Sequence, residues 1–595
     1  MIRSALALGL AAGGLEIALR AEPRLGMGLS ERLAWLGVAV LLSTALTVGA
    51  AGLLLVVRRF VARTPAMGLT AAALVFVHAA LYWRFDLHVN AFTRDPVLLG
   101  GLACIAAGSL ALGWLAERPL RALGGRFELG CLVLALVSAG VGLVLGQPPG
   151  APSQPAVSGP NVLLITLDTV RSDALEPYGG PVATPTIAQL ARQGVLFEQA
   201  IATAPLTEAS HLAMLTGLEP THSGIVTNGT AFGAQPALIS HAFQQAGYAT
   251  GGFVAGFPLH GRWGWTQGFD VYDDDFGVMP GLHRLAIVKA WDQLTLPART
   301  LRERRGDGVI ARSTQWLDGV QGGPWFAWVH LFDPHGPYEA PAPFDMKQAP
   351  PRDGEPLDLP PYWPPALRSV TSTDWLTEAY HAEIRYTDHL LGQLMARLEA
   401  DGSLDHTVVL LVADHGESLT EHDYLYDHGD NLYDPSLRVP LILRLPGQDS
   451  AGLEIPCQVS TVSVAATLLE AAGLPAGQHD RDGASLLPMI HSDGACQPTD
   501  AYATTVAGRL MDDPPLDHAL RGRDRKLIAH QDGSAELYHL GIDPGESHDL
   551  AAEQAAEAAA LHSVLAGHLE GRAEIKAASQ DQGTQDALRA LGYIE

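Results

Sequence analysis

Acidic and imidazole side chains follow apolar segments in the second part of this 595-residue chain. Residues 161–168, NVLLITLD, form a continuous apolar run that ends in Asp168, and a similar run from residue 408 ends in Asp414 and His415. Such runs predict strands buried in a parallel sheet, whose carboxyl ends form the edge where open α/β sheets bind ligands. Oxygen and nitrogen donors at that edge suit a divalent cation such as Zn²⁺, Mn²⁺ or Ca²⁺.

A hydroxyl group stands at the start of a predicted helix. Residues 203–217, TAPLTEASHLAMLTG, predict a helix that begins near Thr207 and ends at Gly217. The free N–H groups at a helix N-terminus favour anions, so Thr207 is placed to act on phosphate or sulfate, and His211 on the same helix face could contact that anion. In the alternative interpretation, Thr207 only caps the helix and His211 lies on the surface.

Further histidines could reach the same cleft. Residues 325–338, WFAWVHLFDPHGPY, predict another buried strand and a loop that carry His330, Asp333 and His335. His428 lies in a His-Gly pair on the loop that follows His415. A single histidine is more often structural than a ligand, but four strand-end clusters of Asp and His in one domain favour a common site.

Several segments together resemble the bacterial sulfatase family of the alkaline phosphatase superfamily. In chain order they are LDTVRSDAL, SHLAMLTG, THSGIVTNG, GYATGGFVAGFPL, WVHLFDPHGPY, ADHGESLTEH, RVPLILRLPG and ELYHLGIDPGESHDLA. The resemblance covers residues 161–550. It implies an α/β/α catalytic domain with a mixed sheet between helices, a smaller C-terminal subdomain from about residue 450, and a helical tail over 551–595.

The resemblance also implies roles for particular residues. The positions that hold a metal beside the nucleophile are matched by Asp168, Thr207, Asp414 and His415. The positions that contact the transferred anion, or a second ion in two-metal relatives, are matched by Asn228, His335 and His428. Asp333 would be an extra ligand for that second ion. Lys526 matches a basic position of the C-terminal part and is expected to have little catalytic role.

The chain departs from the family at the nucleophile. The sulfatase signature C/S-x-P-S-R supplies a Cys or Ser that matures to formylglycine, whereas this chain has Thr207-Glu-Ala-Ser-His211. Threonine cannot give that aldehyde, and threonine nucleophiles resemble those of phosphodiesterases and of lipid phosphoethanolamine or phosphoglycerol transferases. Three functions are therefore considered: a metal-dependent hydrolase of phosphate or sulfate esters, a transferase that takes a headgroup from a phospholipid, and a non-catalytic anion-binding membrane receptor.

Residues 1–146 contain no lysine and predict a transmembrane region. Five apolar stretches, near 4–20, 33–57, 67–83, 97–115 and 127–145, are mostly long enough to cross a bilayer, although Glu16 makes the first also readable as a signal sequence. Arginines between stretches, at 58, 59 and 63 and again at 118, 121 and 126, mark cytoplasmic loops. We expect a multi-pass protein of the cytoplasmic (inner) membrane, with the catalytic domain periplasmic or extracellular after a linker at 147–160. Buried core helices are the alternative.

The charge of the chain excludes one class of partner. The formal net charge is −26, and residues after 150 contain 57 acidic against 26 basic side chains. Nucleic acids and anionic membrane surfaces attract basic patches, so we expect no nucleic-acid partner. Cys457 and Cys496 could form a disulfide bond in an oxidising compartment, but their sequence separation leaves this open.

Overall fold

The computed structural model describes residues 158–575, apart from 277–302, 321–322, 361–362, 365–366, 449, 476–481, 493, 496–498 and 507–515. Nearly all of these residues belong to one compact unit, Gly150–Asp274 together with Arg304–Gln580 and Leu588–Glu595. The five predicted transmembrane stretches and the Pro-rich part of the linker lie outside the described residues. Among the described helices, none has both the length and the apolarity needed to span a bilayer.

Eight strands form a mixed sheet in the order β4-β3-β5-β1-β6-β7-β2-β8. Their bounds are β1 Asn161–Leu167, β2 Val195–Ile201, β3 Ala249–Phe253, β4 Val271–Asp273, β5 Trp325–Leu331, β6 Thr407–Ala413, β7 Arg438–Arg444 and β8 Leu453–Ser460. The central strands β5, β1 and β6 run parallel, and β7 is antiparallel to both of its neighbours. Every residue of β5 and β6 is buried, which explains their continuous apolar sequences.

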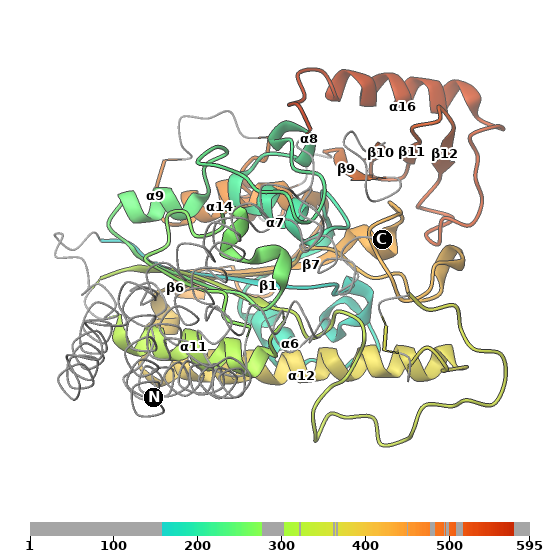
Figure 1. Cartoon of the computed structure of the whole chain (residues 1–595). Helices are drawn as coiled ribbons and strands as arrows, with labels where there is room; N and C mark the ends of the chain where they lie inside the picture. Colours follow the sequence, from blue (N-terminus) through green and yellow to red (C-terminus); the bar gives the residue numbers. More distant parts are fainter. Residues whose placement is uncertain are drawn as a thin grey trace, which may run out of the picture. The chain divides into compact units, whose positions relative to one another are not determined.

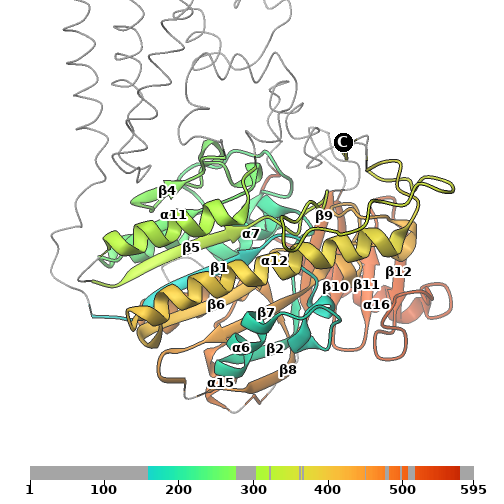
Figure 2. The same cartoon turned by 90° about the horizontal axis from the view of Figure 1, so that it is seen from below.

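Helices cover both faces of this sheet (Figure 1). One layer contains α6 Pro185–Gln193, α11 Gly306–Gly319 and α12 Thr373–Ala400. The other contains α7 Thr207–Thr216, α9 Ile239–Gln245 and α14 Val464–Ala471. Short helices are α8 Pro220–Ser223, α13 Asp434–Leu437 and α15 Leu487–His491. Figure 2 shows α11 and α12 side by side along one face, so the predicted α/β/α arrangement is confirmed.

A smaller antiparallel sheet follows, in the order β12-β11-β10-β9. Its strands are β9 Ala501–Val506, β10 Leu516–Arg521, β11 Lys526–Ala529 and β12 Ala535–Tyr538, and α16, Ala555–His568, packs against it. Leu527 and Leu537 of the sheet share a buried cluster with Leu565 of α16. The strand β8 still belongs to the larger sheet, and the smaller sheet begins at Ala501. The predicted subdomain boundary near residue 450 stays a prediction.

Candidate active site

The carboxylates of Asp168 and Asp414 lie where three parallel strands end side by side. The main-chain N–H of Asp168 donates to Leu331 O at 2.9 Å, and that of Asp414 donates to Leu167 O at 3.0 Å. These bonds continue the β1–β5 and β1–β6 pairing one residue beyond the strands. Asp168, Asp414 and His415 are fully buried, and each offers a ligand atom within 4.8 Å of the others. The structure thus brings these three predicted metal ligands together.

Asp414 and His415 have the orientation that a metal ligand requires. Asp414 Oδ1 accepts the main-chain N–H groups of Thr169 at 3.3 Å and of His415 at 2.7 Å, whereas Oδ2 accepts none from the described residues. His415 Nδ1 lies 3.0 Å from Gly416 O. A carbonyl only accepts, so Nδ1 carries the proton and Nε2, 3.5 Å from Asp414 Oδ2, keeps its lone pair.

Burial governs the electrostatics of this cluster. Desolvation raises the pKa of Asp414 to about 7 and lowers the pKa of His415 well below its usual value, so the imidazole is neutral. The two carboxylates of the cluster are therefore buried beside a neutral imidazole. A divalent cation held by the two carboxylates, His415 Nε2 and a hydroxyl fits this donor set, with Zn²⁺ and Mn²⁺ suited to its mixture of oxygen and nitrogen.

Thr207 is the first residue of α7, not its N-cap, because Leu206 occupies the capping position with extended backbone angles. The Thr207 side chain is fully buried, and its Oγ1 has no hydrogen-bond partner among the described residues. The first turn of α7 contacts Asp414, since Ser210 Oγ donates to Asp414 O at 2.6 Å. The capping interpretation of Thr207 is therefore wrong, and its hydroxyl is available for chemistry.

The structure gives His211 a different position from the predicted one. Its Nδ1 lies 2.8 Å from Thr207 O, and its Nε2 lies 2.9 Å from Thr166 Oγ1. Thr166 Oγ1 also accepts the indole N–H of Trp328 at 3.0 Å. Thr166 therefore donates to Nε2, and Nδ1–H donates to the Thr207 carbonyl. Both ring nitrogens bond protein groups, and Nδ1 also lies 3.4 Å from Asp414 Oδ2, so His211 is buried instead of lying on the surface and supports the backbone of Thr207.

Asn228 presents an amide N–H₂ group beside the nucleophile. Its Oδ1 accepts the main-chain N–H of Glu208 at 2.8 Å, and its buried Nδ2 has no partner among the described residues. The Glu208 carboxylate in turn accepts the main-chain N–H groups of Gly229 at 2.5 Å and Thr230 at 3.3 Å. The donors of Asn228 are therefore oriented by the residue that follows Thr207, as an anion contact requires.

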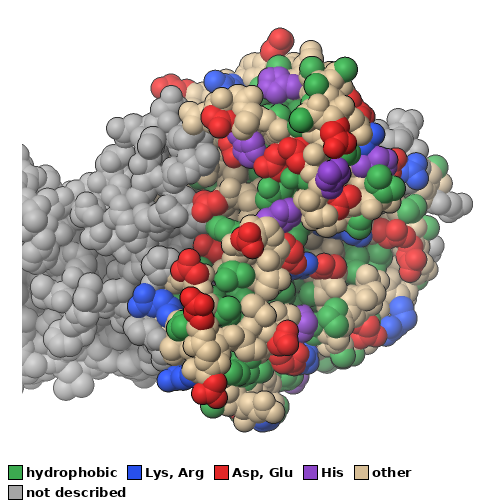
Figure 3. All heavy atoms as spheres, turned by 90° about the vertical axis from the view of Figure 1, so that its right-hand side faces the viewer, with side chains coloured by type: hydrophobic (Ala, Val, Ile, Leu, Met, Phe, Trp, Pro, Cys, Tyr) green, Lys and Arg blue, Asp and Glu red, His purple; other side chains and the backbone are tan. Residues whose placement is uncertain are grey.

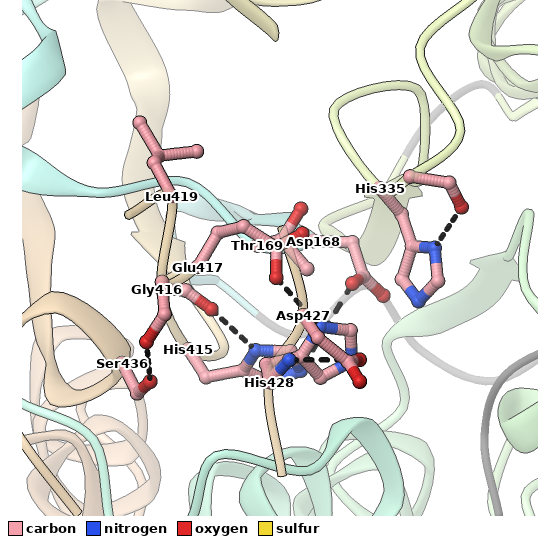
Figure 4. Close-up of polar contacts among 12 residues, drawn as sticks. Asp168, Thr169, His335, His415, Gly416, Glu417, Leu419, Asp427, His428 and Ser436 are labelled. Carbon is pink, nitrogen blue, oxygen red and sulfur yellow. Dashed lines mark hydrogen bonds and ion pairs between the residues drawn. The ribbon is translucent and has the colours of Figure 1, made fainter. Parts of the chain in front are cut away.

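Two predicted histidines stand together next to His415. The ring of His428 lies 4.5 Å from that of His415 and 4.9 Å from that of His335, measured between centroids. His428 Nδ1 bonds Glu417 Oε1 at 3.0 Å (Figure 4), and Tyr338 OH donates to Glu417 Oε2 at 3.3 Å. The carboxylate accepts a hydrogen bond from Nδ1–H, so Nε2 is the nitrogen of His428 that can exchange a proton with a substrate.

Asp333 does not join this group. Both of its carboxylate oxygens accept the main-chain N–H of Gly306, at 3.0 and 3.1 Å, at the start of α11. The Gly306 N–H therefore occupies both oxygens, and the role of Asp333 as an extra metal ligand stays a prediction. Lys526 is also occupied elsewhere, because its ammonium pairs with Asp434 at 2.9 Å and Glu546 at 2.6 Å.

Some residues of the site are not apparent from the sequence. Thr166 and Trp328 support His211 from two separate strands, and nothing in their spacing indicates this. Glu417 has a local signal, since it follows Asp414 and His415 after a single glycine in the sequence DHGE. An acid so close to two ligands can reach a neighbouring imidazole, and sequence reasoning missed it.

Comparisons with known proteins agree with this geometry. The family model described as sulfatase matches residues 160–474, and that described as N-sulphoglucosamine sulphohydrolase, C-terminal, matches 420–572. The choline-sulfatase of Rhizobium meliloti is 26% identical over 436 residues, covering 66% of this chain and 81% of that protein. A multifunctional alkaline phosphatase superfamily protein of Trinickia caryophylli is 26% identical over 476 residues, covering 66% and 89%.

Solved structures share the fold. The phosphonate monoester hydrolase of Agrobacterium radiobacter superposes with a TM-score of 0.54 at 20% identity, covering 69% of this chain and 95% of that one. A structure in complex with its substrate, D-glucosamine-2-N,6-O-disulfate, gives a TM-score of 0.55 at 20% identity, covering 73% and 99%.

Proposed function

This chain belongs to the sulfatase family and is an ester hydrolase of the sulfatase and alkaline phosphatase superfamily, and from this premise we propose that Thr207 is the nucleophile of a metal-dependent hydrolase of sulfate or phosphate esters. One observation carries the proposal. Thr207 Oγ1 is buried and makes no hydrogen bond with the described residues, on a helix turn that contacts Asp414. A buried hydroxyl without a partner is costly, which is expected where it binds a cation and attacks a substrate.

The residues suggest a two-step displacement. A divalent cation bound by Asp168, Asp414 and His415 would lower the pKa of the Thr207 hydroxyl and polarise the ester. The Thr207 hydroxyl then gives its proton to solvent, and its Oγ1 forms a bond to sulfur or phosphorus as the bond from that atom to the ester oxygen breaks. An imidazolium, His335 or His428, gives the departing oxygen its proton. Asn228 Nδ2 donates to an oxygen of the transferred group. Water attacks the threonine adduct in the second step and releases the anion.

The departure from the family signature bears on the substrate. A threonine adduct must be hydrolysed at sulfur or phosphorus, because threonine has no aldehyde hydrate that could expel the anion by breaking its own C–O bond. This restriction makes phosphate diesters and monoesters candidates as well as sulfate esters. On the face drawn in Figure 3, Lys and Arg side chains are scattered among Asp and Glu side chains and form no continuous basic patch.

The test is a panel of substrates with matched variants. Wild-type protein loaded with Zn²⁺ or Mn²⁺ is offered aryl sulfates, phosphomonoesters, phosphodiesters and labelled phospholipids, with and without an acceptor alcohol. We expect turnover of at least one ester class, lost in Thr207→Ala. Full activity in Thr207→Ala would rule out Thr207 as the nucleophile. Transfer of a phospholipid headgroup to the alcohol in place of hydrolysis would favour a transferase.

We further propose that the catalytic domain is held outside the cytoplasmic membrane by the five apolar stretches of residues 1–146. Arginines gathered between these stretches support this orientation. Reporter fusions after residues 62, 120 and 160 provide the test. The reporter is an enzyme that is active only when it is exported. Its fusion after residue 160 should be active, whereas its fusions after residues 62 and 120, within the two arginine-rich loops, should be inactive. Activity in the opposite pattern would reverse the topology.

A further inference from the structure

A second group of metal-binding side chains lies between α8 and α16, two helices that are neighbours in Figure 1. Glu219 immediately precedes α8, His222 lies within it, and His568 is the last residue of α16. Asp482 joins them from the segment that follows α14. Donor atoms of Glu219, His222 and Asp482 all lie within 4.8 Å of one another. None of the four residues has a role in the proposed catalytic mechanism.

Hydrogen bonds hold this group together. His222 Nδ1 lies 2.9 Å from Asp482 Oδ1, and His568 Nε2 lies 2.6 Å from Glu219 Oε2. The main-chain N–H of Glu219 donates to Asp482 Oδ2 at 2.7 Å, which fixes the carboxylate with Oδ1 toward His222. The centroids of the two imidazole rings are 6.1 Å apart. Two carboxylates and the His222 imidazole therefore converge on one small volume, and His568 joins them through its bond to Glu219.

The backbone around the group is also positioned. The main-chain N–H of Asp482 donates to Gly217 O at 2.8 Å, at the C-terminal end of α7. The main-chain N–H of Ala573, just after α16, donates to Thr221 O at 2.9 Å. The site therefore joins the nucleophile-bearing part of the large domain to the C-terminal helix.

Charge and donor type indicate the ligand. With neutral imidazoles the group carries two negative charges, which one divalent cation would balance. Two nitrogen and two oxygen donors suit the closed, four-coordinate arrangement of structural zinc sites. The alternative is a pair of His⁺–carboxylate ion pairs with no metal. We propose that Glu219, His222, Asp482 and His568 bind Zn²⁺ and that this ion fastens α16 to α8.

Zinc stoichiometry of the full-length protein tests the proposal. The variant Asp168→Asn/Asp414→Asn removes ligands of the catalytic site and should keep one tightly bound zinc per chain after dialysis. Adding His222→Ala or His568→Gln should remove it, whereas adding His562→Ala, at an exposed histidine of the same helix, should not. Retention of zinc in both His222→Ala and His568→Gln would overturn the proposal, and so would a folded double variant with no zinc.

A measurement on the unmodified protein guards against variants that fail to fold. Crystals grown with Zn²⁺ should give an anomalous difference peak among the four side chains at the zinc edge, in addition to any peak at Asp414. Clear density for the four side chains with no anomalous peak between them would leave the ion-pair alternative and overturn the proposal.

Discussion

The main-chain N–H of Glu208 donates to Oδ1 of Asn228 at 2.8 Å. This bond links the residue after Thr207 to a loop twenty residues further along the chain, and it decides which end of the Asn228 amide faces the substrate. Because Oδ1 is occupied, Nδ2 is the atom left to contact an anion. One backbone amide therefore connects the proposed nucleophile, Thr207, with the proposed donor, Asn228.

Replacing Asn228 tests this orientation. Asn228→Asp keeps an acceptor for the Glu208 N–H but replaces the donor with a second acceptor. We expect kcat/KM to fall about 10²–10³-fold, the usual effect of removing one preorganised donor to a developing anion. Asn161→Asp, at the opposite end of β1, is the matched control and should retain activity within about threefold. Steady-state kinetics on one ester substrate gives both values, and equal effects in the two variants would contradict the assignment.

Changing Thr207 should separate activity from stability. Thr207→Val has nearly the same shape, and the lost hydroxyl makes no hydrogen bond with the described residues. In the metal-free protein the free energy of unfolding should therefore stay equal or rise by about 1 kcal/mol, because a buried polar group without a partner is removed. Activity should fall at least ~10³-fold, whereas Thr207→Ser should keep part of it. Denaturant unfolding and kinetics check the two expectations, and a clear loss of stability would indicate an unrecognised structural bond.

Much of this site could be predicted because a continuous apolar run in the sequence shows where a buried strand ends. The runs before Asp168 and Asp414 are buried throughout, so their first polar residues had to emerge at the same sheet edge. The buried hydroxyl of Thr207 could also be singled out, since a hydroxyl at a helix start is a local pattern. These features depend on short stretches of sequence.

Features that depend on packing between distant segments were not predictable. Helical spacing places His211 on the same face as Thr207, but every residue of α7 is buried, so that face meets β1 and β5 instead of solvent. Asp333 follows a strand as Asp168 and Asp414 do, yet both of its oxygens accept the N–H of Gly306 at the start of α11. Cys457 is disulfide-bonded, but its partner lies outside the described residues, and a bridge to Cys496 stays a prediction.

Glu417 is expected to act through His428. Glu417→Gln retains the size of the side chain but weakens the acceptor for His428 Nδ1, so the proton is no longer fixed there. Partners of this kind typically change activity by about 10- to 100-fold. We expect most of that loss in kcat, with KM little changed and metal content retained. Glu421→Gln, which lies on the same loop and pairs with Arg171 instead, should retain kcat. A loss confined to KM would place Glu417 in substrate binding instead.

Asp333 should be structural. Asp333→Ala leaves the Gly306 N–H at the start of α11 without its acceptor, and an unsatisfied buried donor costs about 1–3 kcal/mol. Bound metal and kcat/KM should stay within about threefold of the wild type. Asp307→Ala, at an exposed position of the same helix turn, should change stability by less than about 0.5 kcal/mol. Loss of a metal ion in Asp333→Ala, measured by elemental analysis, would revive the idea of a second ion at this residue.

The raised pKa of Asp414 predicts an inverted pH dependence for the metal-free protein. Burial raises this pKa from 3.8 to about 7, so between about pH 4 and 7 the folded chain binds a proton that the unfolded chain has released. The contribution of Asp414 to the free energy of unfolding therefore falls as the pH rises through that window. Asp414→Asn removes this titration, and its stability relative to the wild type should increase between pH 5 and pH 8, by on the order of 2–4 kcal/mol. The difference between the free energies of unfolding of the two proteins at each pH cancels the contribution of the buried histidines, because these titrate in both proteins.

With metal present, the free energy of unfolding should instead rise with pH, because the cation and the proton compete for the Asp414 carboxylate. Zinc or manganese affinity of the wild type should fall below about pH 7, with about one proton released for each ion bound. Urea unfolding of chelator-treated protein at pH 5 and pH 8, and proton release during metal titration, measure the two effects. The same stability difference between wild type and Asp414→Asn at both pH values would show that Asp414 is ionised throughout, and the metal would then bind a site whose charge is already in place.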